Sequence, residues 1–128
     1  MSKPISRPMH GILTDYPYVL LVGLVGPALV GASGTPLLVF RGAALFILLQ
    51  SLITRAEWGL FRVMPYKIHL VLDVVGGLGV LGSPWLLGFA DQPGPKWFAV
   101  VAGLFGIGAG TLSKTDEMPA RLPTASHP

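Results

Sequence analysis

Histidine and aspartate occur as a pair at two places in the sequence. His10 is followed by Asp15, and His69 is followed by Asp73. His69 and Asp73 are four residues apart, so their side chains share one face of a predicted helix. Imidazole and carboxylate groups are ligands for iron, zinc and manganese, and they can also relay protons. With Glu57, these residues are the candidate chemical groups of the chain.

Three interpretations of these groups stay open. In the structural one, which we favour, Asp15 and Asp73 form ion pairs with Arg55, Arg62 or Lys67, and the histidines cap or bridge them. The second is a metal site in a helix bundle, with ligands drawn from His10, Asp15, Glu57, His69 and Asp73. The third is a proton relay built from the same residues. The Glu-x-x-His spacing of di-iron bundles is absent, so we expect no catalytic, cofactor-binding or metal-binding residue as first choice.

Several other kinds of chemistry are excluded by composition. The chain has no cysteine, so disulfides, iron–sulfur clusters and thiolate zinc sites are ruled out. No glycine pattern typical of nucleotide binding follows a predicted strand. No basic surface with interleaved aromatic residues is present, so we expect no nucleic-acid partner. We therefore predict a protein that is not an enzyme and has no cofactor.

Apolar residues fall in four long blocks. Hydrophobic residues make up 52% of the 128 residues and charged residues only 12%, against roughly 25% in soluble domains. The blocks, at about 16–32, 37–53, 68–90 and 97–112, are long enough to cross a bilayer as helices. We predict an all-α, four-helix transmembrane bundle over 15–113, after a polar cytoplasmic lead at 1–14. Residues 114–128 are predicted to be a disordered cytoplasmic tail.

The positions of lysine and arginine predict the orientation in the membrane. Seven lie on the side of the termini and the central junction: Lys3, Arg7, Arg55, Arg62, Lys67, Lys114 and Arg121. Only Arg41 and Lys96 lie on the opposite side. Because basic residues are retained in the cytoplasm, both termini are predicted to be cytoplasmic.

The two halves of the chain resemble each other. The histidines of the two halves are 59 positions apart, the aspartates 58, and Pro27 and Pro84 57. Each half would be a helical hairpin that starts on the same side of the membrane. We therefore expect two tandem hairpins related by a pseudo-two-fold axis along the membrane normal.

Small residues and one proline are the candidate structural positions. Gly106 and Gly110 are spaced to let two membrane helices approach closely. Pro84 removes a hydrogen bond inside the third predicted helix, and the Ser83 hydroxyl can satisfy the freed backbone. Trp85 would anchor this helix end at the membrane interface. Packing within the chain is the favoured use of the glycines, with dimerisation or docking onto a larger complex as the alternative.

Several short motifs occur in a fixed order along the chain. They are His10-Gly11 followed by Asp15-Tyr16, Glu57-Trp58-Gly59-Leu60 with Arg62 and Met64-Pro65, His69 with Leu72-Asp73, and Ser83-Pro84-Trp85-Leu86-Leu87-Gly88-Phe89. Over about residues 9–113 this order resembles the SPW-repeat family of small bacterial membrane proteins. The resemblance implies a multi-pass helical protein of the bacterial inner membrane, but no reaction. The first half departs from the pattern, with Gly26-Pro27-Ala28 in place of Ser-Pro-Trp.

The sequence therefore predicts a non-enzymatic structural or accessory protein. We expect it to pack in the bilayer with itself or with a larger membrane complex, because its loops are short and its helices carry many small residues. The alternative is a metal-binding or proton-handling membrane protein that uses the cytoplasmic His/Asp cluster. A solute transporter is less favoured, because few polar groups lie at mid-membrane depth.

Overall fold

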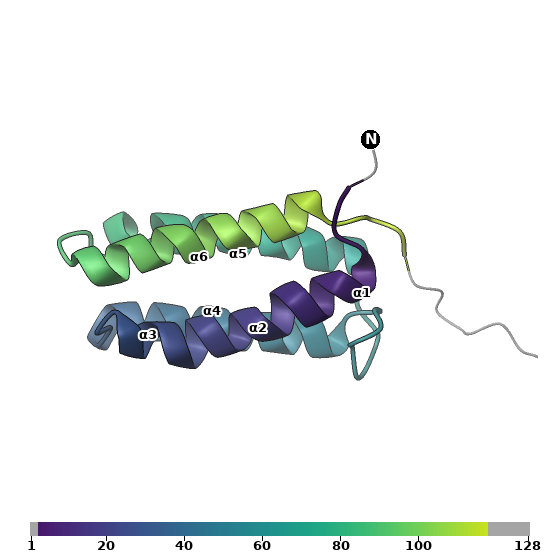
Figure 1. Ribbon diagram of the computed structural model, residues 1–128, viewed down its shortest axis with the longest axis horizontal. Helices are drawn as coiled ribbons and strands as arrows, with labels where there is room; N and C mark the ends of the chain where they lie inside the picture. Colours follow the sequence, from purple (N-terminus) through teal and green to yellow (C-terminus); the bar gives the residue numbers. More distant parts are fainter. Residues whose placement is uncertain (1–2, 118–128) are drawn as a thin grey trace, which may run out of the picture.

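The computed structural model describes residues 3–117, and this part of the chain is all-helical, without strands (Figure 1). One continuous helical segment covers Arg7–Leu29. Its parts are α1 (Arg7–Met9), the π-helix η1 (His10–Asp15), α2 (Tyr16–Leu20), the π-helix η2 (Leu21–Val25) and α3 (Gly26–Leu29). Three further helices follow: α4 (Gly34–Ile53), α5 (Tyr66–Leu86) and α6 (Pro93–Leu112). The predicted all-α bundle is confirmed.

The helix boundaries differ from the predicted ones mainly at prolines and glycines. The first helix begins at Arg7 instead of Tyr16, because Pro8 sits in its first turn, where a missing N–H costs nothing. In the same way α6 begins at Pro93 instead of Trp97. α5 ends at Leu86 instead of Ala90, shortly before Gly88, whose positive φ of 79° breaks the helix. The polar lead therefore contributes two further turns to the bundle.

The start of the predicted disordered tail is packed against the bundle. The carboxylate of Glu117 accepts hydrogen bonds from the backbone N–H groups of Tyr66 and Lys67, each at 3.1 Å. It therefore satisfies two of the free donors at the N-terminus of α5. Residues 118–128 lie outside the described part of the chain.

The helices form two layers, which Figure 1 shows one above the other: the Arg7–Leu29 segment with α4, and α5 with α6. Within the second layer the backbones are nearly in contact. A Cβ atom at Gly77 would lie 2.7 Å from the carbonyl oxygen of Gly103, and one at Gly103 would lie 2.6 Å from that of Gly77. Gly106 and Gly110 face the same seam, where a Cβ at Gly110 would lie 2.7 Å from the carbonyl oxygen of Leu70. Only glycine permits this approach.

The helix surfaces fit a lipid environment. All four helical segments are long and apolar enough to cross a membrane. Large apolar side chains are exposed on every one of them, such as Leu29, Leu38, Leu86 and Val101. In lipid this exposure costs nothing, whereas in water it would be a large unfavourable surface. The structure is thus compatible with a multi-pass membrane protein.

The Ser-Pro-Trp sequence lies at the end of α5. Pro84 has no N–H to donate to the carbonyl of Val80, one helical turn earlier. The Ser83 hydroxyl donates to that carbonyl instead, at 2.6 Å, and so satisfies the freed acceptor. Trp85 is exposed on the outer surface of the bundle.

Candidate metal centre

The two His/Asp pairs meet at one end of the bundle. His10 and Asp15 come from η1, and His69 and Asp73 come from α5. All four residues are buried, with exposed fractions between 1% and 6%. One potential ligand atom from each lies within 4.8 Å of those from the other three. The structure therefore brings together groups that are far apart in the sequence.

Two of the four His–Asp contacts cross between the layers, and the other two lie within η1 and within α5. Nε2 of His10 lies 3.0 Å from Oδ1 of Asp15 and 2.8 Å from Oδ2 of Asp73. Nε2 of His69 lies 3.0 Å from Oδ2 of Asp15 and 3.5 Å from Oδ2 of Asp73. The two Nε2 atoms are 3.2 Å apart. Both imidazoles and both carboxylates thus point at one small volume.

A π-helical turn aligns the first pair. His10 and Asp15 are five residues apart, whereas His69 and Asp73 are four apart, which is the spacing of one face of an α-helix. In η1 the N–H of Tyr16 bonds to the carbonyl of Gly11, five residues earlier. This wider turn places residues five apart on the same face. The π turn therefore accommodates the extra residue between His10 and Asp15. In both pairs, the histidine and aspartate side chains then lie on one helix face directed at the centre.

Two hydroxyl groups fix which nitrogen of each imidazole carries hydrogen. The Ser113 hydroxyl donates its only proton to the carbonyl of Ala109, so it accepts at 2.7 Å from Nδ1–H of His10. Likewise the Thr54 hydroxyl donates to the carbonyl of Gln50 and accepts at 2.8 Å from Nδ1–H of His69. In the neutral form of each ring, Nε2 is then a bare lone pair directed at the centre.

The Asp73 carboxylate has one oxygen fixed and one unpartnered. Its Oδ1 accepts a hydrogen bond of 2.5 Å from the side-chain amide of Gln50. Its Oδ2 is buried 2.8 Å from His10 Nε2, an ion-pair contact when His10 is protonated, and it accepts no hydrogen bond of good geometry from the described residues. A buried oxygen without a partner costs free energy unless something further binds it.

With both imidazoles neutral, the centre would be a set of acceptors without a donor. Two neutral Nε2 atoms and two carboxylates converge, and like groups this close repel one another in a buried space. Additional positive charge relieves the repulsion, either as a metal cation or as extra protons on the imidazoles. Both forms of chemistry were among the alternatives that the sequence left open.

Glu57 lies apart from the centre. It pairs with Arg7, whose Nε lies 2.8 Å from the Glu57 Oε1 and whose second guanidinium nitrogen donates to Oε2 at 2.9 Å. The hydrogen bonds from Arg7 lower the pKa of the Glu57 carboxyl. The expectation that Glu57 joins the His/Asp cluster is wrong, because the helix that begins at Arg7 brings a better cationic partner to it.

The ion pairs expected of the two aspartates are also not formed in the described part of the chain. Asp15 and Asp73 contact histidines. Arg62 instead donates to backbone carbonyls of its own junction, those of Gly59 and Glu57. The basic residues stay at the rim, where hydration is available, while the aspartates turn into the bundle.

The junction between α4 and α5 covers this end of the bundle. The indole N–H of Trp58 donates to the carbonyl of Pro8 at 2.9 Å, and the hydroxyl of Tyr16 donates to the carbonyl of Trp58 at 2.5 Å. Tyr66, which is 1% exposed, packs edge-on against His10 with ring centroids 5.8 Å apart. The His/Asp cluster is thus shielded from this side by aromatic side chains.

Sequence reasoning missed the supporting residues Gln50, Thr54 and Ser113. A signal for two of them was present: Thr54 and Ser113 are 59 positions apart, the same offset as the histidines. The pairing is crosswise, because the hydroxyl of each half binds the histidine of the other half. Gln50 has no such signal, since Ala109 stands at the matching position.

Comparison of the chain with protein-family models, with curated proteins and with solved structures finds no match. The resemblance to the SPW-repeat family stays a prediction from the motifs. The function must therefore be inferred from the geometry of this centre.

Proposed function

We propose that this chain is a membrane protein that binds one divalent transition-metal ion, such as Zn²⁺, Fe²⁺ or Mn²⁺. The ligands are Nε2 of His10, Nε2 of His69 and one carboxylate oxygen each from Asp15 and Asp73. One observation carries the proposal: four ligand atoms of the types that these metals prefer converge in a buried space.

The spacing of these atoms supports a single ion. Zinc binds nitrogen and oxygen ligands at about 2.0–2.1 Å, so the ligands of a tetrahedral site are roughly 3.3 Å apart. The separations between the two Nε2 atoms, and from them to the carboxylate oxygens, run from 2.8 to 3.5 Å, with the two histidines approaching different oxygens of Asp15. One ligand atom from each of the four residues lies within 4.8 Å of the other three. A cation between these atoms would reach coordination distance once the carboxylates turn to present one oxygen each.

The charges and the surrounding hydrogen bonds support the same function. Two ionised aspartates, two neutral histidines and a divalent cation sum to zero, which suits a site removed from water. Metal-binding histidines commonly donate their other N–H to an oxygen that fixes the ring, as Ser113 and Thr54 accept here. Gln50 orients the carboxylate of Asp73 in the same manner.

The accessory role favoured by the sequence stays a prediction, and metal binding is compatible with it. A structural metal would fasten the two helical layers together, since each layer supplies two ligands. Proton sharing within the same four residues is the competing explanation, and the experiment below separates the two.

Metal analysis of the purified protein tests the proposal. The protein in mild detergent is incubated with each metal separately, freed of excess ion, and analysed by mass spectrometry for metal per chain. We expect one equivalent in the wild type and loss in His69→Gln and Asp73→Asn. Glu57→Gln is the matched control and should keep the metal, because Glu57 pairs with Arg7 instead.

Folding of every variant is checked by circular dichroism and gel filtration. If a variant does not fold, absorption of the Co²⁺-loaded wild type gives a second readout, because tetrahedral nitrogen and oxygen ligands produce a characteristic visible band. Folded wild-type protein that binds no metal and gives no such band would overturn the proposal and favour proton sharing.

A further inference from the structure

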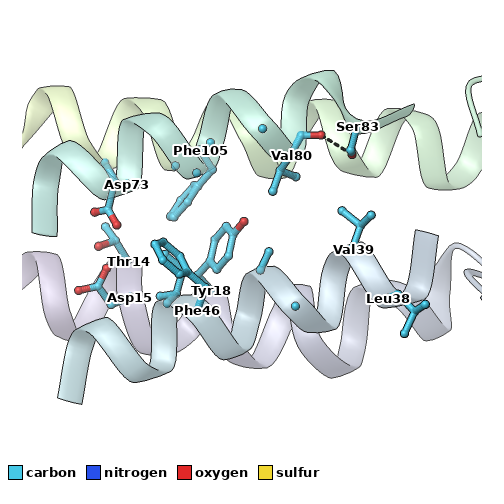
Figure 2. A pocket seen from close by; sticks show the side chains of 18 of the residues that line it. Thr14, Asp15, Tyr18, Leu38, Val39, Phe46, Asp73, Val80, Ser83 and Phe105 are labelled. Atoms are coloured by element: carbon cyan, nitrogen blue, oxygen red, sulfur yellow. Dashed lines mark hydrogen bonds between the residues drawn. The ribbon is translucent and has the colours of Figure 1, made fainter. Parts of the chain in front are cut away.

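A cavity of about 380 Å³ lies between the two helical layers and reaches the His/Asp cluster. Asp15, Asp73 and Thr14 line one end of it, as Figure 2 shows. Its volume falls in the range of small-molecule binding sites, roughly 300–1,000 Å³. The carboxylates of the proposed metal centre thus have one side against protein and another side against this space.

The rest of the cavity wall is apolar and partly made of glycine. Phe46, Phe105 and Val80 point into the space in Figure 2. Gly42 and Gly79 also line it, and a Cβ atom at either would meet no atom within 4 Å. These two glycines do not serve close helix packing. They leave room between the layers.

The cavity is long and opens away from the cluster. Asp73 and Ser83 both line it, and ten residues of helix separate them, which is about 15 Å. At the far end it is bordered by Leu38 and Leu87, whose side chains are 74% and 55% exposed. Because these helices carry an apolar surface, this opening lies where lipid chains can enter.

The polar end limits the kind of molecule that fits. Asp73 Oδ2 is buried without a hydrogen-bond partner among the described residues, so it can accept a proton donor or share a metal. The ring of Tyr18 also reaches between the layers, with its hydroxyl in the cavity (Figure 2). With a divalent ion bound, the centre carries no surplus positive charge to balance an acidic head. A neutral head is therefore favoured over a carboxylate or a phosphate.

We propose that this cavity binds a neutral, single-chain lipid whose hydroxyl or carbonyl head faces the metal centre. The apolar chain lies along Phe46 and Phe105, and the oxygen of the head contacts the ion or Asp73. This inference rests on the proposed metal site for its polar end, while the apolar part of the cavity does not depend on the metal.

Photolabelling with a medium-chain alcohol that carries a diazirine near its methyl end tests this proposal. The protein is reconstituted in lipid nanodiscs with Zn²⁺, irradiated, digested, and mapped by peptide mass spectrometry. We expect saturable labelling of cavity residues, suppressed by excess unlabelled alcohol. The matching fatty acid should compete at least tenfold more weakly. Exposed residues such as Leu104 report labelling from bulk lipid, which the competitor does not suppress.

Glycine variants separate the cavity from the metal site. Gly79→Leu and Gly42→Leu fill open space in the cavity and should reduce its labelling at least fivefold while metal content stays unchanged. Gly108→Leu is the matched control, because a Cβ there also meets no atom within 4 Å but Gly108 does not line the cavity.

The outcomes distinguish the two proposals. Stoichiometric metal without saturable labelling would overturn the lipid proposal and leave the metal site intact. Labelling that persists in Gly79→Leu and Gly42→Leu at the wild-type level would also overturn it. Competition by the fatty acid equal to that by the alcohol would contradict the neutral head. Absence of metal from a folded wild type, with cavity labelling retained, would refute the metal site and the contact of the head with the ion, and would leave lipid binding in the apolar part of the cavity.

Discussion

At the scale of single residues, the hydroxyls of Ser113 and Thr54 decide the chemistry of the centre. Each hydroxyl donates its proton to a backbone carbonyl and therefore accepts a hydrogen bond from the N–H of an imidazole. That arrangement directs the lone pairs of His10 and His69 inward. The proposed metal binding thus depends on two residues that carry no ligand atom.

Removing these hydroxyls should weaken metal binding without abolishing it. Ser113→Ala and Thr54→Val are expected to lower the metal affinity about 10- to 100-fold each, because the imidazoles lose the groups that fix them. Competition with a metal chelator measures the change. Thr111→Val is the control, since Thr111 also donates to a helix carbonyl but is exposed. Equal losses in Thr111→Val and Ser113→Ala would contradict the role given to Ser113.

The Arg7–Glu57 ion pair predicts a pH dependence of stability. Because Arg7 holds the pKa of the Glu57 carboxyl below its ordinary value of 4.5, the pair stabilises the fold above that pH. The stabilisation is lost as the pH falls from 4.5 through the lower folded-state pKa. Since Glu57 is 34% exposed, we expect only about 0.5 kcal/mol at neutral pH.

Thermal unfolding of Glu57→Gln and the wild type, measured in parallel from pH 7 to pH 3, checks this prediction. The difference between the two proteins isolates the pair, because every other ionisable group is the same in both. The wild type should be slightly more stable at pH 7, and the difference should disappear at the acid end. A difference that grows toward low pH would contradict it.

At the scale of elements, the π-helices account for the changing offset between the two halves. The offset falls from 59 at the histidines to 58 at the aspartates and 57 at Pro27 and Pro84. η1 lies across the first step and η2 across the second, and each contains a hydrogen bond five residues long. Each π turn thus takes up one extra residue. The tandem repeat itself stays a prediction. These turns explain how its two halves could match although the first half has two more residues.

The seam between α5 and α6 depends on glycine. Gly103→Ala should destabilise the protein by about 1–3 kcal/mol, because the added Cβ would lie 2.6 Å from the backbone of Gly77. Gly108 lies on the same helix, and a Cβ atom there would meet no atom within 4 Å. Gly108→Ala should therefore be neutral or slightly stabilising. Thermal unfolding in detergent compares the two. Equal stability of both variants would show that the seam is not close-packed.

At the scale of the whole molecule, the predicted orientation has both termini and the α4–α5 junction in the cytoplasm. If all four helical segments cross the membrane, Arg7 and Leu112 lie on one side and the α5–α6 loop on the other. The proposed metal centre would then lie near the cytoplasmic surface, and the open end of the cavity in the outer half of the bilayer.

Cysteine labelling tests this orientation, and the chain helps because it contains no cysteine of its own. A membrane-impermeant thiol reagent added to intact cells should label Asp91→Cys, in the exposed α5–α6 loop. Lys114→Cys should react only after the cells are opened. The reverse pattern would show that the molecule has the opposite orientation. Labelling of both cysteine variants in intact cells would contradict four crossings.

Much of the architecture followed from the sequence, because long apolar blocks have one stable environment and one backbone arrangement in lipid. The sequence also singled out His10, Asp15, His69 and Asp73 as candidate ligands. It misplaced Glu57 and the start of the first helix, because the polar lead was assigned to water. Whether Glu57 joins the cluster is decided by which partner the fold brings nearest.

By itself, the sequence determined the number of helices and the residue types available for chemistry, since hydropathy and composition are local properties. Only the tertiary structure decided that the four ligands converge, that Ser113 and Thr54 fix the imidazoles, and that a cavity leads to the centre. These features depend on how helices distant along the chain rotate and pack against each other. Such packing depends on many side-chain contacts between the two layers that must be satisfied together, so it cannot be derived from one segment alone.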